Sequence, residues 1–108
     1  MNLETKAVEL AEAIKDSEEY KELRSAEAQL KLDPKAMDLL EEIQTSQQEV
    51  MVAQQNGQQI DQETIQKLQN LESQMQLNLT IKKVMEKRQA FEEVMKNVNQ
   101  TISQKLSE

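Results

Sequence analysis

The chain has no cysteine, histidine or tryptophan, and it has one residue each of glycine, proline, tyrosine and phenylalanine among 108. Histidine is the commonest proton shuttle, and histidine and cysteine are the usual ligands of zinc, haem and iron–sulfur clusters. Without cysteine there is no disulfide, and with one glycine there is no glycine-rich loop that could cradle a phosphate. We therefore expect no enzyme, no catalytic residue, no metal site and no cofactor.

Long apolar runs are also missing. The longest is Val50-Met51-Val52-Ala53, whereas a membrane-spanning helix needs about 20 predominantly apolar residues. The first residues lack the basic region and the apolar region that together make a signal peptide. The sequence therefore predicts a cytoplasmic protein that neither crosses nor binds a membrane.

The abundant residues are glutamate, glutamine, lysine, leucine, alanine and methionine, which all enter a helix at little entropic cost. Apolar residues make up 37% of the chain and aromatic residues 2%, so a helical monomer buries little surface to offset its chain entropy. Composition and length together predict an all-α protein with a single helical domain over residues 1–108. We expect it to form a homodimer or to bind another protein.

The net charge of −7 is unevenly distributed along the chain. Residues 1–49 carry 13 acidic and 6 basic side chains, whereas residues 79–108 carry 4 acidic and 6 basic ones. The two ends are therefore complementary in charge. This favours antiparallel packing of the last helix against the first two, within one chain or between two chains.

Apolar residues recur at spacings of three and four, which predicts five helices at about 3–15, 17–32, 34–55, 62–77 and 79–106. We expect the third and fourth helices to form an antiparallel hairpin at the centre of an elongated bundle, because helices of over twenty residues exceed a compact domain of this size. Asp16 and Glu19 resemble a capping box before the second helix. The predicted seam of the third helix contains Ala36, Leu40, Ile43, Gln47, Val50 and Gln54.

The lone proline marks the start of the third helix. Pro34 suits the first helical position, because its φ is already helical and its missing N–H would have no partner there. Asp33 is then the N-cap, and Leu32 with Met37 forms a hydrophobic staple around it.

Three further helix ends can be placed from the sequence. Gly57 ends the third helix in the left-handed conformation, and Asp61 caps the fourth. For the fifth helix, either Asn78 or Thr80 can serve as the cap. The predicted caps and turn residues are therefore Asp33, Pro34, Gly57 and Asp61.

The fifth helix carries a stripe of coiled-coil type with one cation in it, which we interpret as a seam for a dimer or a partner. Its members are Ile81, Val84, Arg88, Phe91, Met95, Val98 and Ile102. The same helix carries a basic cluster that raises the alternative of direct RNA binding, formed by Lys82, Lys83, Lys87 and Arg88. Because Phe91 is the only aromatic ring nearby, we favour pairing of these bases with Glu86, Glu92 and the acidic N-terminal half. Nucleic acid is not the expected partner.

A third hypothesis is a hydrolase that uses helical carboxylates. Glu18 and Glu22 share one helix face and could hold a hard cation. No calcium loop with a glycine accompanies them, and we favour a solvated acidic face.

The cap and stripe residues resemble those of a known family over nearly the whole chain. They are the run Ser17-Glu18-Glu19-Tyr20-Lys21-Glu22-Leu23, then Ala26 and Leu30, then Asp33-Pro34-x-Ala36 and Leu40, followed by the Gly57 turn and residues 78–102. This pattern resembles the YlbF/YmcA family of small helical bacterial proteins, and the glutamine-rich, cysteine-free form is most similar to its YheA branch. The resemblance implies a self-associating cytoplasmic protein of Bacillus-type bacteria.

The resemblance also carries an expectation about function. In that family, YlbF and YmcA act with a third protein, YaaT, as accessory factors of ribonuclease Y, and they influence competence, sporulation and biofilm formation. Those members are associated with iron–sulfur clusters through cysteines, and because this chain has no cysteine, cluster binding does not carry over to it. Our first hypothesis is therefore a non-catalytic regulatory protein that works through protein–protein interaction, in RNA processing or developmental regulation.

Overall fold

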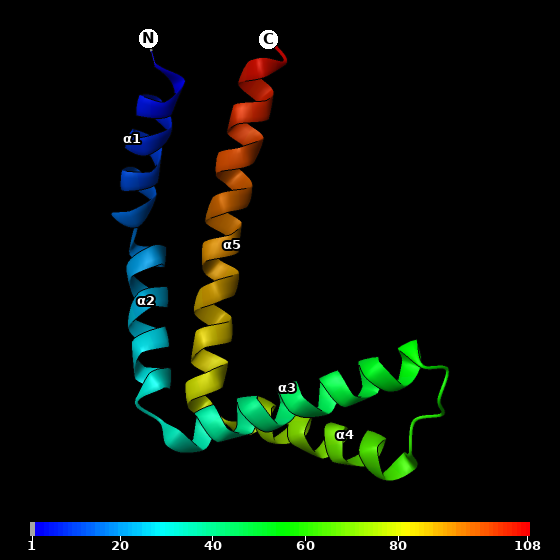
Figure 1. Ribbon diagram of the computed structural model, residues 1–108. Helices are drawn as coiled ribbons and strands as arrows, with labels where there is room; N and C mark the ends of the chain where they lie inside the picture. The colour runs from blue at the N-terminus through cyan, green and yellow to red at the C-terminus, as the bar shows by residue number, and fades with distance from the viewer. Residues whose placement is uncertain (1) are drawn as a thin grey trace. The chain divides into compact units, whose positions relative to one another are not determined.

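The computed structural model describes residues 2–108. They form five α-helices, namely α1 (Leu3–Lys15), α2 (Glu18–Lys31), α3 (Pro34–Gln55), α4 (Gln62–Leu77) and α5 (Leu79–Leu106) (Figure 1). Residues 2–108 contain no strand, and the predicted all-α class is confirmed. Over the same residues, no helix combines the length and the apolar character needed to cross a bilayer.

The chain divides into two compact units. Unit 1 contains the residues up to Ala28 together with Val84–Glu108, and unit 2 contains Gln29–Lys83. The helices α2 and α5 therefore contribute residues to both units. The single domain expected from the length stays a prediction.

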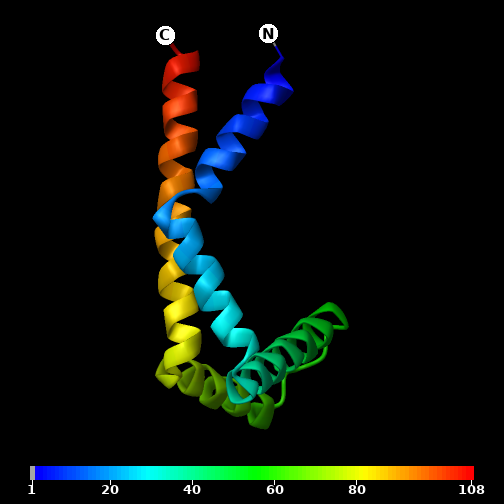
Figure 2. The same ribbon diagram turned by 90° about the vertical axis from the view of Figure 1, so that its left-hand side faces the viewer.

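In unit 1, α2 packs against α5 in the opposite direction (Figure 2). The rings of Tyr20 and Phe91 meet edge to face, with centroids 5.6 Å apart and planes at 61°, a geometry that aromatic pairs favour. Leu23 and Ala26 of α2 and Val84 of α5 are buried. This is the antiparallel packing that the charge distribution favours, and for α2 it occurs within one chain.

The cap of α2 differs from the prediction. Asp16 still has helical dihedral angles at the end of α1, with φ −82° and ψ −7°, so its side chain is not in the N-cap position. Instead, the Ser17 hydroxyl accepts a hydrogen bond from the Tyr20 N–H at 3.2 Å and donates one to the Ile14 carbonyl at 2.6 Å. The predicted Asp16–Glu19 capping box is therefore wrong. Ser17 caps α2 and also bonds the last turn of α1.

In unit 2, α3 and α4 form the predicted antiparallel hairpin (Figure 1). Its buried side chains are mostly small on α3, where Ala36 and Ser46 are 0% and 2% exposed. Gln47 and Gln54 are exposed, although the sequence pattern placed both on the seam. The seam runs instead through Ser46 and half-buried Ala53, because small side chains allow two helices to approach closely.

The turn between α3 and α4 is built on Gly57, whose φ is +68°. The N–H of Gln58 donates to the Ala53 carbonyl at 2.9 Å, and the N–H of Gly57 donates to the Gln54 carbonyl at 3.2 Å. These two bonds make a Schellman motif, which satisfies carbonyls that the helix end leaves free. After the turn, the Asp61 side chain accepts from the Glu63 N–H at 3.2 Å and caps α4.

We predict that Gly57→Ala lowers the free energy of unfolding by about 1–2 kcal/mol, the cost of a left-handed conformation for a residue with a Cβ. A Cβ at this position would meet no atom within 4 Å, so the loss comes from the backbone alone. Urea unfolding of Gly57→Ala, Gly57→Asn and the control Gln58→Ala tests this. Asparagine should cost less than alanine, and equal stability of Gly57→Ala and the wild type would contradict the assignment.

Candidate functional site

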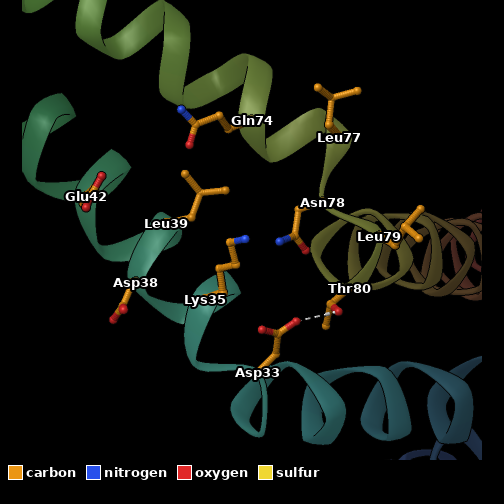
Figure 3. Close-up of a pocket in the computed structure, with 10 residues that line it drawn as sticks. All are labelled: Asp33, Lys35, Asp38, Leu39, Glu42, Gln74, Leu77, Asn78, Leu79 and Thr80. Atoms are coloured by element: carbon orange, nitrogen blue, oxygen red, sulfur yellow. Dashed lines mark hydrogen bonds between the residues drawn. The ribbon is translucent and has the colours of Figure 1, made fainter.

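The N-terminal ends of α3 and α5 are joined by one carboxylate in unit 2 (Figure 3). Asp33 Oδ1 accepts a hydrogen bond from the Ala36 N–H at 3.2 Å, which caps α3. Asp33 Oδ2 accepts a second one from the Thr80 hydroxyl at 2.8 Å. We call this pair the Asp33–Thr80 clasp. It connects residues that are 47 positions apart in the sequence.

Local sequence sets both sides of the clasp. Pro34 occupies the first turn of α3 and leaves Asp33 in extended backbone, with φ −108° and ψ 94°, as a residue before proline and an N-cap both require. Asn78 caps α5, because its Oδ1 accepts from the Ile81 N–H at 3.0 Å. With Asn78 in that role, the Thr80 hydroxyl is available to bond Asp33.

The clasp keeps Asp33 charged. The Thr80 hydroxyl, and after it the Ala36 backbone N–H, lowers the pKa of the Asp33 carboxyl below its ordinary value of 3.8. Both bonds are stronger when the carboxyl is ionised, which is why they favour the charged form. The two bonds therefore keep the Asp33 carboxyl ionised to a lower pH than that of an ordinary aspartate.

The predicted staple between Leu32 and Met37 is wrong. Leu32 is 83% exposed, so its side chain lies in solvent and not against the first turns of α3. Met37 is exposed as well. The hydrogen bonds of Asp33 hold the chain at this corner, where the sequence predicts an apolar contact.

An open hollow of about 630 Å³ lies beside the clasp (Figure 3). Leu77 and Leu79 line it and are 81% and 80% exposed, and Leu39 contributes a half-buried side chain. The remaining lining residues are polar or charged, namely Asp33, Lys35, Asp38, Glu42, Gln74, Asn78 and Thr80. The sequence pattern offers one signal for this hollow, because Leu77 and Leu79 flank the Asn78 cap without belonging to a predicted stripe.

The carboxylates of the hollow do not form a catalytic pair. Figure 3 shows the Asp33 carboxylate directed at Thr80, whereas the side chains of Asp38 and Glu42 point away from it. Two carboxylates that act as an acid and base pair must both lie within hydrogen-bond reach of the reacting substrate. Within residues 2–108, no group of three or more potential metal-ligating side chains comes together.

The predicted seam of α5 changes in burial along its length. Ile81 and Val84 are buried, and Ile102 is 44% exposed. Between them, Phe91, Met95 and Val98 are half-buried and Arg88 is exposed. The C-terminal half of the seam is therefore only partly covered within one chain.

The basic cluster is partly neutralised. Lys87 Nζ lies 3.0 Å from Glu22 Oε2 of α2, so both a predicted RNA contact and a predicted cation ligand are engaged in one ion pair. Lys82, Lys83 and Arg88 are exposed. The partner of Lys87 comes from the acidic N-terminal half, in line with the preferred interpretation of this cluster.

We predict that the clasp makes stability depend on pH in a defined direction. The Asp33 pKa is lower in the folded state than its ordinary value of 3.8. The stabilisation is therefore fully present above pH 3.8 and is lost as the pH falls through the folded-state value. Asn caps a helix about as well as Asp but carries no charge. Urea unfolding across pH should show wild type and Asp33→Asn converging at acid pH.

The matched variant for this prediction is Thr80→Val, which removes the hydroxyl and keeps the side-chain shape. The Asp33 pKa, followed by the NMR shift of its carboxyl carbon, should move back toward 3.8 in Thr80→Val. Thr101→Val on α5, whose hydroxyl bonds only its own helix, should leave the Asp33 pKa unchanged. A stability difference between wild type and Asp33→Asn that does not vary with pH would contradict the clasp.

The chain has close relatives among bacterial proteins. A UPF0342 protein of Halalkalibacterium halodurans is 36% identical over 107 residues, which are 99% of this chain and 92% of the relative. A UPF0342 protein of Alkalihalophilus pseudofirmus is 34% identical over 107 residues, covering 99% of this chain and 91% of the relative. Assignment to the YheA branch stays a prediction.

The same fold occurs in solved structures. A chain in the crystal structure of Bacillus subtilis RicA in complex with RicF superimposes with a TM-score of 0.86 at 20% identity, covering 97% of this chain and 93% of that one. A protein of unknown function (DUF964) from Bacillus stearothermophilus gives a TM-score of 0.74 at 23% identity, covering 97% and 92%. Residues 3–107 match the family model described as control of competence regulator ComK, YlbF/YmcA. The chain therefore belongs to the YlbF/YmcA family, as its cap and stripe residues suggest.

Proposed function

We propose that this protein acts by binding other proteins, without catalysis, and that it first pairs with a second copy of itself. The observation that carries the proposal is the exposure of α1. This helix has 13 residues, and none of them is buried. A helix of this length is marginal in water on its own, because nucleation is costly and tertiary packing supplies most helical stability. We infer that α1 needs a contact that one copy does not provide.

The surface for such a contact lies in unit 1. Both views place α1 at the same end of unit 1 as the C-terminal half of α5, with the two helices running in opposite directions (Figure 1, Figure 2). Apolar side chains along both helices are exposed or only half-buried, namely Leu3, Leu10 and Ile14 of α1 and Met95, Val98, Ile102 and Leu106 of α5. Two copies contribute four such helices, which is enough for a bundle with an enclosed apolar core.

Charge supports the same pairing. The α1 helix, Leu3–Lys15, has three acidic and two basic side chains, whereas residues 94–106 have two lysines and no acid. Placing α1 of one copy against the end of α5 of the other therefore brings opposite net charges together. In a two-fold dimer this contact occurs twice, because each copy uses the same patch.

The comparisons support a regulatory role through protein contacts. The family is described by its control of a competence regulator, and RicA, in the structure that shares this fold, is in complex with RicF. We extend this to the present chain as a cytoplasmic accessory protein in RNA processing or developmental regulation. Direct RNA binding has less support, because Lys87 is already paired with Glu22.

We predict that Leu10→Glu or Ile102→Glu converts the dimer to a monomer. Both side chains are at least 39% exposed in one copy, so the change should not disturb the fold of a single chain. Placing a charge in the apolar contact should raise the dimer dissociation constant about thirtyfold or more, the effect of losing one interface hot spot. Sedimentation velocity over a range of protein concentrations measures this.

The control for this experiment is Met51→Glu on α3, which makes the same kind of change at a side chain that is 55% exposed in unit 2. It should leave the dissociation constant unchanged. If the wild type sediments as a monomer at high concentration while hydrogen exchange shows a stable α1, the proposed pairing is wrong.

A further inference from the structure

The hollow beside the clasp exposes apolar surface that the fold of the chain does not use. Leu77 and Leu79 lie on either side of Asn78 and are 81% and 80% exposed. Single exposed leucines are common on protein surfaces, but these two line one concavity together with half-buried Leu39. At about 630 Å³, the hollow lies within the range of about 300–1,000 Å³ that is typical of binding pockets.

The half-buried polar side chains of the hollow, Asp33, Asn78 and Thr80, already have partners. Both oxygens of Asp33 accept hydrogen bonds, from Ala36 and from Thr80. The side-chain oxygen of Asn78 accepts from the Ile81 N–H. The hollow therefore offers apolar contact more than new hydrogen bonds, which suits an apolar side chain better than a small polar molecule.

The charges around the hollow are mostly negative. Asp33, Asp38 and Glu42 line it, with Lys35 as the only base among its lining residues. A second, smaller hollow shares Asp38 and Glu42 and adds Glu41 and Lys67. Together the two hollows have four acidic and two basic side chains, so the apolar surface has an acidic border along α3.

We infer that this hollow binds an amphipathic helical segment of a partner protein, with leucine-type side chains on its apolar edge and lysine or arginine beside them. Such a segment presents apolar side chains at helical spacing to Leu39, Leu77 and Leu79 and basic ones to the acidic border. A second copy fits less well, because two such hollows facing each other would bring their acidic borders together. The inference rests on the proposed function of protein binding and adds the place and the chemistry of the partner.

The test uses a fluorescent synthetic helix of leucine and lysine, with leucine on one face, titrated with the full chain and followed by anisotropy. Two control peptides share its length, one with glutamate in place of lysine and one with the same residues in scrambled order. We expect saturable binding of one amphipathic basic peptide per chain. The scrambled peptide should bind about tenfold more weakly or worse, and the acidic one should not bind.

Variants of the protein locate the binding. Leu77→Ser with Leu79→Ser removes the apolar contact, and Asp38→Lys with Glu42→Lys reverses the acidic border. Each pair should weaken binding about tenfold or more. The matched control is Glu49→Lys with Glu63→Lys, which changes the net charge equally at exposed positions of unit 2 that do not line this hollow. It should keep binding within about threefold.

Three results would overturn the inference. The first is equal weakening by the Glu49/Glu63 control, which shows attraction by net charge alone. The second is dissociation of the dimer by the Leu77/Leu79 variant, which shows that a second copy fills the hollow. The third is no binding of the basic amphipathic peptide by a well-folded wild type. Because one chain supplies the whole hollow, a Leu10→Glu monomer should still bind the peptide, so loss of the dimer and loss of peptide binding are measured separately.

Discussion

The small supply of apolar side chains limits every contact in this protein. With 37% apolar and 2% aromatic residues, each helix buries at most a single narrow line of side chains. In unit 1 that line consists of Leu23, Ala26 and Val84, and the half-buried rings of Tyr20 and Phe91 add one aromatic contact. In unit 2 it runs through residues as small as Ala36 and Ser46. Close approach of helices compensates for small side chains, since contact area depends on distance as well as on residue size.

Hydrogen bonds at the helix ends provide stabilising interactions that the small apolar core does not. Each described junction is held by hydrogen bonds from side chains or turns, through Ser17, Asp33, Gly57, Asp61 and Asn78. Such bonds specify where a helix starts and in which direction the chain enters it. At the start of α3, the Asp33–Thr80 clasp takes the place of an apolar staple, and Leu32 remains in solvent. Hydrogen bonds, and not apolar contacts, therefore define the helix junctions in a fold with few apolar residues.

The features that the sequence predicts well are local ones. The expected helix bounds lie within one residue of those of the structure, because caps and periodicity act within a few positions of each other. Ser46 and Gln47 are both compatible with a helical stripe. Which of them is buried depends on how closely α3 and α4 approach, and the smaller residue, Ser46, is the buried one. Asp16 has the residue type of an N-cap, but it lies at the C-terminal end of α1 with helical dihedral angles. The Asp33–Thr80 bond spans 47 positions, so no local pattern contains it, and the two leucines beside Asn78 are the one local signal of the hollow next to it.

The two exposed apolar surfaces differ in whether each can pair with an identical copy of itself, and this difference is the reason that we propose different partners for them. Contact between two identical copies requires a patch that complements itself. The α1 and α5 surface of unit 1 meets this condition, because an acidic helix and a basic helix lie on the same patch. The hollow of unit 2 does not, since two acidic borders repel each other. A dimer of the proposed kind, formed through unit 1, would therefore carry two identical hollows for the proposed basic partner. Two linked basic segments would bind such a dimer more tightly than either one alone, when their linker spans the distance between the hollows.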